Sequence, residues 1–134
     1  MMKNCLLLAL LALLSALVGF AHADWVRVDH ASTDINLYVD MDTRQSSGHG
    51  SKVMWHLVDF STVQNFSGKP FRSIKGQDEY DCDQGVRRDI FHLWHKDSMG
   101  SSQMVNAAYI PGPWTVPAPG SVEQTLMRLV CANP

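Results

Sequence analysis

Apolar and polar residues alternate along most of the chain after residue 24, and this period of two limits the fold more than any other feature. Side chains on a strand point alternately to opposite faces, so such alternation is typical of sheet strands. Six segments show it: 26–28, 35–39, 53–60, 71–75, 86–95 and 104–110. The predicted turns lie at 32–34, 45–51, 65–70 and 98–102. Because these links are short, the sequence predicts a six-stranded antiparallel sheet, with segment 53–60, apolar on both faces, near its centre.

The period changes after residue 110. Four prolines lie between residues 111 and 119 and exclude regular strand pairing there. The next apolar residues have helical spacing: Val122, Leu126, Leu129 and Val130. Ser121 and Gln124 form a capping box at the start of this helix, which is about three turns long and too short to be stable alone. We therefore expect an α+β fold in which a C-terminal helix docks its apolar stripe on the sheet.

The first 23 residues have the layout of a secretory signal peptide. A basic residue precedes an apolar stretch over residues 5–20, and small residues occupy the positions that signal peptidase reads. The stretch is shorter than the ~20 residues of a membrane-spanning helix. Cleavage between Ala23 and Asp24 is predicted, with residues 24–134 forming one exported domain. Because Cys5 comes at the start of the stretch, we expect no lipid anchor and no membrane span, and a periplasmic, surface or secreted location.

Two cysteines, Cys82 and Cys131, remain in the predicted mature chain. An even pair of cysteines in an exported protein indicates a disulfide. A metal site built on the two thiols would need a nearby histidine or a second cysteine pair, which the sequence does not supply. Because Cys131 lies in the last turn of the predicted helix, the bond would tether the helix to the sheet.

Charge and motifs exclude several functions. The formal net charge is −2, so there is no basic field to attract a nucleic acid. The sequence contains no GxSxG nucleophile motif, no HExxH zinc motif and no phosphate-binding glycine loop. His92 and His95 are three residues apart on a predicted strand, so they point to opposite faces and cannot share one ion. We therefore predict no catalytic residue, no cofactor and no metal.

Two features are candidates for contact with a ligand. Lys69, Arg72 and Lys75 form a local basic cluster, which would serve either as a ligand contact or as the solvated charges of an edge strand. Trp114 lies among the prolines of 111–119, where core packing is the favoured interpretation and an exposed aromatic recognition feature is the alternative. The sequence leaves both alternatives open for each feature.

Several ordered motifs resemble the surface-adhesin protein E-like family of Gram-negative bacteria. The most specific are the Arg-Ser-x-Lys segment at 72–75, its distance to Cys82, and the terminal Val-Cys-Ala-Asn at 130–133. The other matching residues are 25–30, 38–40, Phe71, 79–81, Trp114, Pro119, Ser121, Glu123 and Leu129. The resemblance implies the same six-stranded sheet with a C-terminal helix tethered by Cys82 and Cys131, and it leaves a homodimer open.

The resemblance also implies a function. It favours an exported, non-catalytic domain that binds a protein, such as the host matrix or serum proteins vitronectin and laminin. A periplasmic structural or inhibitory module with a bacterial partner is one alternative. A small exported enzyme is another, and it would need a carboxylate or histidine pair that converges in a pocket, for which Asp81, Asp83 and His92 are the candidates.

Overall fold

The computed structural model describes residues 23–30, 32–109 and 111–132. The predicted signal peptide therefore lies outside the described residues except for Ala23. Six strands follow one another along the chain: β1 (Val26–Val28), β2 (Ile35–Gly48), β3 (Ser51–Phe66), β4 (Lys69–Asp81), β5 (Val86–His95) and β6 (Met104–Ala108). A single 3-10 turn, η2 (Ser98–Gly100), lies between β5 and β6, and helix α2 (Val122–Cys131) follows β6. None of the helices in the described ranges has the length and hydropathy to span a membrane.

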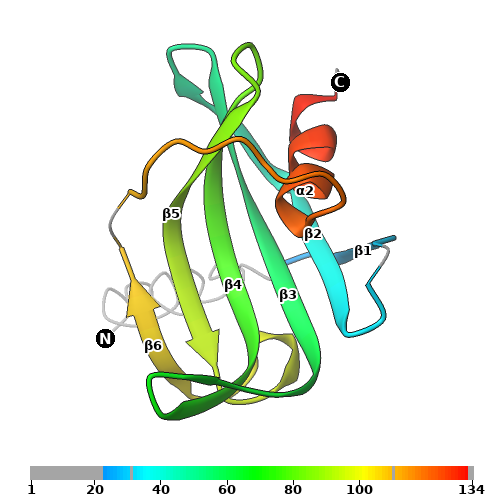
Figure 1. The fold of residues 1–134 in the computed structure, drawn as a ribbon, viewed down its shortest axis with the longest axis vertical. Coiled ribbons are helices and arrows are strands. Elements are labelled where there is room, and N and C mark those ends of the chain that lie inside the picture. Colours follow the sequence, from blue (N-terminus) through cyan, green and yellow to red (C-terminus); the bar gives the residue numbers. More distant parts are fainter. Residues whose placement is uncertain (1–22, 31, 110, 133–134) are drawn as a thin grey trace, which may run out of the picture.

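The strands form one sheet in their sequence order, and every neighbouring pair is antiparallel. Helix α2 lies against one face of this sheet, and the segment before it crosses over from the β6 side (Figure 1). The predicted α+β fold is therefore confirmed, as is the central position of β3 between β2 and β4. Because β4 also has neighbours on both sides, the interpretation of 69–75 as an edge strand is wrong.

The predicted turn at 45–51 is mostly strand. β2 continues to Gly48, which pairs with Ser51, so only His49 and Gly50 remain in the turn. Both have positive φ, 52° and 80°, as a two-residue hairpin turn requires. Pairing with β3 satisfies the backbone groups of this polar segment, and this outweighs the weak strand propensity of serine and glycine.

The predicted loop at 65–70 is also shorter than expected. β3 reaches Phe66 and β4 begins at Lys69, so the turn consists of Ser67 and Gly68. β4 then continues past the predicted 71–75 as far as Asp81, because it pairs with β3 on one side and β5 on the other. Strand β6 ends at Ala108, and the predicted end of this strand at residue 110 lies outside the described residues.

The core lies between α2 and the sheet. The apolar stripe of α2 provides two fully buried residues, Leu126 and Val130, while Val122 and Leu129 pack against them. The sheet supplies the other buried members of this cluster: Leu37, Val39, Met54 and Tyr80. The helix stripe predicted from sequence is therefore confirmed.

The disulfide between Cys82 and Cys131 is present, with the two Cα atoms 5.6 Å apart. It joins the turn after β4 to the last residue of α2. The predicted tether between helix and sheet is therefore confirmed.

Helix α2 begins with Ser121 as its N-cap. The Ser121 hydroxyl oxygen accepts a hydrogen bond from the Gln124 backbone N–H at 3.1 Å. The Gln124 side chain accepts one from the Gly120 N–H at 2.9 Å. The hydrogen bond to the Ser121 side chain is therefore the one that a capping box predicts. The Gln124 side chain accepts from the N–H of Gly120, one residue before the N-cap, and not from that of Ser121.

We expect Ser121→Ala to lower the free energy of unfolding by about 1 kcal/mol, because the first turn of α2 loses the acceptor for one of its free N–H groups. Urea denaturation monitored by circular dichroism measures the change. Ser61→Ala is the control, since Ser61 is exposed and no hydrogen bond of its hydroxyl occurs among the described residues. Equal effects of the two substitutions would contradict a capping role.

Candidate functional site

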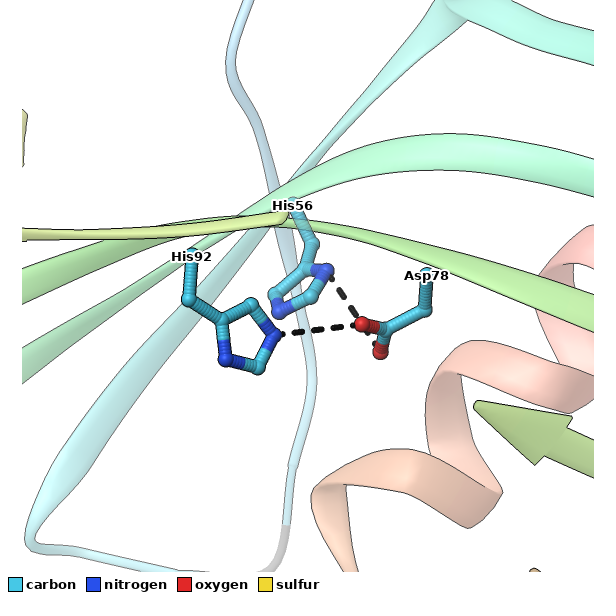
Figure 2. A group of neighbouring side chains, drawn as sticks. All are labelled: His56, Asp78 and His92. Atoms are coloured by element: carbon cyan, nitrogen blue, oxygen red, sulfur yellow. Dashed lines mark hydrogen bonds and ion pairs between the residues drawn. The ribbon is translucent and has the colours of Figure 1, made fainter. Parts of the chain in front are cut away.

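Three strands place polar side chains on the face of the sheet that α2 covers. Gly76 of β4 pairs with His56 of β3 on one side and with His92 of β5 on the other. Paired residues point to the same face, so the two imidazoles flank a residue that has no side chain. Asp78, two residues further along β4, points to this face as well, and its carboxylate lies beside both imidazoles (Figure 2).

These side chains form a buried ion-pair network. His92 Nε2 lies 3.2 Å from Asp78 Oδ1, and His56 Nδ1 lies 4.0 Å from Asp78 Oδ2. Arg87 of β5 binds the same carboxylate, with its Nη2 2.7 Å from Asp78 Oδ2, and it also pairs with Asp89. The Asp78 side chain is 2% exposed. Its charge is therefore balanced within the protein and not by water.

The neighbours of Asp78 determine how the buried groups titrate. Burial alone would raise the pKa of Asp78, but His56, His92 and Arg87 outweigh that effect and hold this pKa well below its usual value. Burial, assisted by Asp78, raises the pKa of Tyr80, whose hydroxyl donates to Asp78 Oδ2 at 3.3 Å. Burial lowers the pKa of His56, and the attraction of Asp78 offsets only part of this change. At neutral pH the network thus contains an ionised Asp78 and a neutral His56.

Acid should destabilise the protein from about pH 6.5 downward. Because burial lowers the pKa of His56 in the folded state from 6.5, the unfolded chain takes up a proton at higher pH than the folded chain does. The stability contributed by neutral His56 is therefore complete above pH 6.5 and is lost as the pH falls through the folded pKa. The expected slope is up to about 1.4 kcal/mol per pH unit. Urea unfolding at a series of pH values in the presence of a chelator measures it.

Other charged groups near His56 affect this slope: Asp78, His92, Arg87 and Glu123. Burial and the neighbouring Lys75 also lower the pKa of His95, on the other face, so His95 contributes to the same trend. His56→Gln should therefore reduce the pH dependence without abolishing it. An equally steep loss of stability in His56→Gln and the wild type would contradict the assignment to His56.

A cavity of about 240 Å³ adjoins the network beneath α2. Its polar lining consists of His56, Asp78, Arg87, Asp89, His92 and Glu123. Glu123 lies in the first turn of α2. Of these six residues, the sequence pattern indicated only His92 as a candidate. Alternation predicts which face of the sheet a side chain points to, but it does not predict which residues of the neighbouring strands lie beside it. Gly76 was the available signal, since an isolated glycine within a strand often marks the close approach of other groups.

The two histidines of β5 lie as predicted. His92 contacts Asp78 on the face covered by α2, whereas His95 pairs with Ser73 and lies near Lys75. They are therefore on opposite faces and do not share a site.

The three residues of the enzyme alternative do not converge. Asp81 Oδ1 accepts hydrogen bonds from the N–H groups of Asp83 and Gln84, in the turn between β4 and β5. His92 lies opposite Gly76, about 16 Å further along β4 from Asp81. The two aspartates are turn residues, and the structure contradicts a pocket shared with His92.

The three predicted basic residues do not form one basic surface. Lys69 Nζ donates to the backbone oxygen of Val105 in β6 at 3.2 Å. Arg72 Nη2 donates to the carbonyl oxygens of Phe60 and Ser61 in β3, at 3.1 and 3.2 Å. Lys75 is half-buried, with its side chain beneath Gly100. Lys69 and Arg72 thus form hydrogen bonds within the fold and Lys75 packs beneath Gly100, and contact with a ligand stays a prediction for all three.

Trp114 lies at the surface on an anchored segment. Its side chain is 41% exposed, and the Arg88 guanidinium lies 4.6 Å from the centre of its ring. The next residue, Thr115, exchanges two backbone hydrogen bonds with Arg87, of 2.9 and 2.8 Å. The indole is therefore presented by backbone that is paired to β5, and the favoured interpretation of Trp114 as a core residue is wrong.

Residues 25–132 match the family model described as Surface-adhesin protein E. The chain belongs to the surface-adhesin protein E family. The match extends from β1 to the end of α2, so it includes the whole sheet, the helix and both disulfide cysteines.

The fold of this surface-adhesin protein E family member is similar to a solved structure, that of Haemophilus influenzae protein E. The TM-score is 0.55 and the sequence identity 10%, with 81% of this chain and 93% of that chain covered. No curated protein matches the sequence. At 10% identity, this structural similarity shows that the two proteins share a fold, and it carries no information about a shared ligand.

Proposed function

We propose that this chain is an exported, non-catalytic binding domain that engages a protein ligand, as a surface adhesin does. The observation that carries the proposal is the match of residues 25–132 to the surface-adhesin protein E family. The disulfide between Cys82 and Cys131 supports export, because such bonds form and persist in oxidising compartments. We propose a host matrix or serum protein as the ligand and the cell surface as the site of action.

The surface around Trp114 combines an exposed aromatic, an arginine and an exposed aliphatic side chain. Trp114 is stacked with Arg88, and Val116 beside it is 76% exposed. Arg88 is in turn held by Glu79, with Nη2 and Oε2 2.6 Å apart. Tryptophan and arginine are the residues most often found at the energetic centre of protein interfaces. We call Trp114, Val116 and Arg88 the Trp114 surface and propose that it contacts the ligand.

The basic residues have a smaller part in this proposal. Lys69 is exposed and would act as a charge at the edge of an interface, which changes association rate more than affinity. Arg72 and Lys75 are half-buried and reach a ligand only with the outer part of their side chains.

Affinity capture tests the proposed function. Purified protein is immobilised and exposed to vitronectin and laminin in one arm and to periplasmic extract in the other, and cell fractionation locates the native protein. Saturable binding of a host protein together with surface exposure is the expected result. Retention of a periplasmic protein alone, with no protein at the surface, would replace adhesion by a periplasmic structural or inhibitory role.

We expect Trp114→Ala to weaken binding of the captured ligand at least about tenfold, because truncating a central aromatic residue usually costs more than 1 kcal/mol. The free energy of unfolding should fall by no more than about 1 kcal/mol, the typical value of the lost contact with Arg88. Surface plasmon resonance and urea denaturation measure the two quantities. Val63→Ala is the control, at a side chain 62% exposed on β3. Unchanged affinity in Trp114→Ala would remove the Trp114 surface from the binding site.

A further inference from the structure

The buried network contains a set of atoms suited to a metal ion. One nitrogen each of His56 and His92 and one oxygen of Asp78 all lie within 4.8 Å of one another. Ligand atoms on a tetrahedral zinc ion are about 3.3 Å apart, since zinc bonds to nitrogen and oxygen are about 2.0–2.2 Å long. The His92 and Asp78 atoms already meet this separation, at 3.2 Å. The His56 nitrogen lies within 4.8 Å of these two atoms, so binding of an ion requires it to move closer to them.

Gly76 makes room for the two imidazoles. A Cβ atom at residue 76 would lie 2.5 Å from Cε1 and 2.6 Å from Nε2 of His56. It would also lie 2.9 Å from Cδ2 of His92. Any side chain at residue 76 would therefore displace both rings. The absence of a Cβ is what allows two histidines from strands on either side of β4 to face a common point.

One ring nitrogen of His56, Nδ1, has no hydrogen-bond partner among the described residues. The side chain is 6% exposed, and the 4.0 Å from Nδ1 to Asp78 Oδ2 is too long for a hydrogen bond. A buried polar atom left unpaired is costly. A metal ion would satisfy the lone pair of Nδ1, and neutral imidazole is the form that binds metals.

The charge of the cavity lining is also appropriate for a divalent cation. Three carboxylates, Asp78, Asp89 and Glu123, face one guanidinium, that of Arg87. The lining therefore carries a formal charge of −2 when both imidazoles are neutral. Arg87 binds Oδ2 of Asp78 and leaves Oδ1 directed at His92. The carboxylate would therefore bind the ion through Oδ1 while Arg87 orients it through Oδ2.

We propose that His56, Asp78 and His92 bind one divalent transition-metal ion, for which Zn²⁺ is the best match. Two imidazoles and one carboxylate are ligands that zinc takes in proteins, whereas calcium and magnesium prefer oxygen alone. The fourth position faces the cavity beneath α2 and is open to water or to a small anion. The ion would connect β3, β4 and β5 across the centre of the sheet. The sequence-based prediction of no metal weighed the two cysteines, the HExxH motif and the pair His92 and His95, but no combination of residues from different strands.

Zinc titration of the purified exported protein tests the site. After removal of metals by a chelator, competition with a chromogenic zinc indicator is expected to show one Zn²⁺ per chain, and Ca²⁺ is expected not to compete. His56→Gln and His92→Gln should each lower zinc affinity at least about 100-fold, since even the loss of an outer partner of a ligand costs 10–100-fold. His49→Asn is the matched control, at an exposed histidine with positive φ that asparagine tolerates, and it should bind zinc as the wild type does.

Nuclear magnetic resonance of the wild-type imidazoles keeps the test independent of whether the variants fold. One equivalent of Zn²⁺ is expected to shift the ring nitrogens of His56 and His92 and to leave those of His49 and His95 unchanged. Failure to bind zinc at micromolar concentration would overturn the proposal. Stoichiometric binding that both glutamine variants retain, or shifts confined to other histidines, would overturn it equally. None of these results depends on the adhesin function, which the capture experiment tests separately.

Discussion

Loss of the disulfide is expected to lower the free energy of unfolding by about 4 kcal/mol. The bond between Cys82 and Cys131 closes a span of 49 residues, and cross-linking a span of this length removes much of the entropy of the unfolded chain. Small domains have only about 5–15 kcal/mol of stability in total. The double substitution Cys82→Ser with Cys131→Ser should therefore bring the protein close to its unfolding threshold.

Urea denaturation of the double serine variant, compared with the oxidised wild type, gives the difference. Reduced wild-type protein is the control, and it should unfold at the same urea concentration as the variant. Mass spectrometry without reducing agent should find the peptides of Cys82 and Cys131 joined. Two free thiols in the exported protein, or a loss below about 1 kcal/mol, would contradict a stabilising cross-link.

Replacing Asp78 with asparagine is expected to cost about 3 kcal/mol of stability, because it removes the charge that balances a largely buried Arg87. The substitution preserves the size of the side chain, so the loss reports the charge and not a cavity. Urea denaturation near neutral pH, in the presence of a chelator, measures this effect without any contribution from bound metal.

Asp89→Asn is the matched control for Asp78→Asn. Asp89 pairs with the same guanidinium, but its side chain is 47% exposed, compared with 2% for Asp78. Because water screens an exposed pair, we expect Asp89→Asn to cost less than about 1 kcal/mol. Equal losses in the two variants would show that burial of Asp78 is not the cause.

The order and number of strands and the helix could be predicted because their signals are local. Alternation in 86–95 and the helical spacing of Leu126 and Val130 depend on neighbouring residues alone. The extent of β2, β3 and β4 could not be predicted this way. Their ends are polar and rich in glycine, and they are strand because a long neighbour pairs with them.

Less of the candidate site than of the fold could be predicted from the sequence. His56, Asp78 and His92 lie on three strands, and only the register of β4 with both neighbours places them together. Ending the predicted strand at residue 75 left Gly76 and Asp78 outside the sheet. With β4 extended by three residues, alternation alone would have placed Asp78 on the face that α2 covers.

The order of the strands determines how the protein folds. Each strand after β1 pairs with the strand before it, so the sheet is built from contacts between neighbouring strands, and we expect it to form before α2 docks. Helix α2 docks on strands that precede it by tens of residues, and until it does so Asp78 and Arg87 remain hydrated. We therefore expect their desolvation to be a late step of folding. Docking of α2 also brings Cys131 to Cys82, so we expect the pair to be oxidised mainly in chains whose sheet is already assembled.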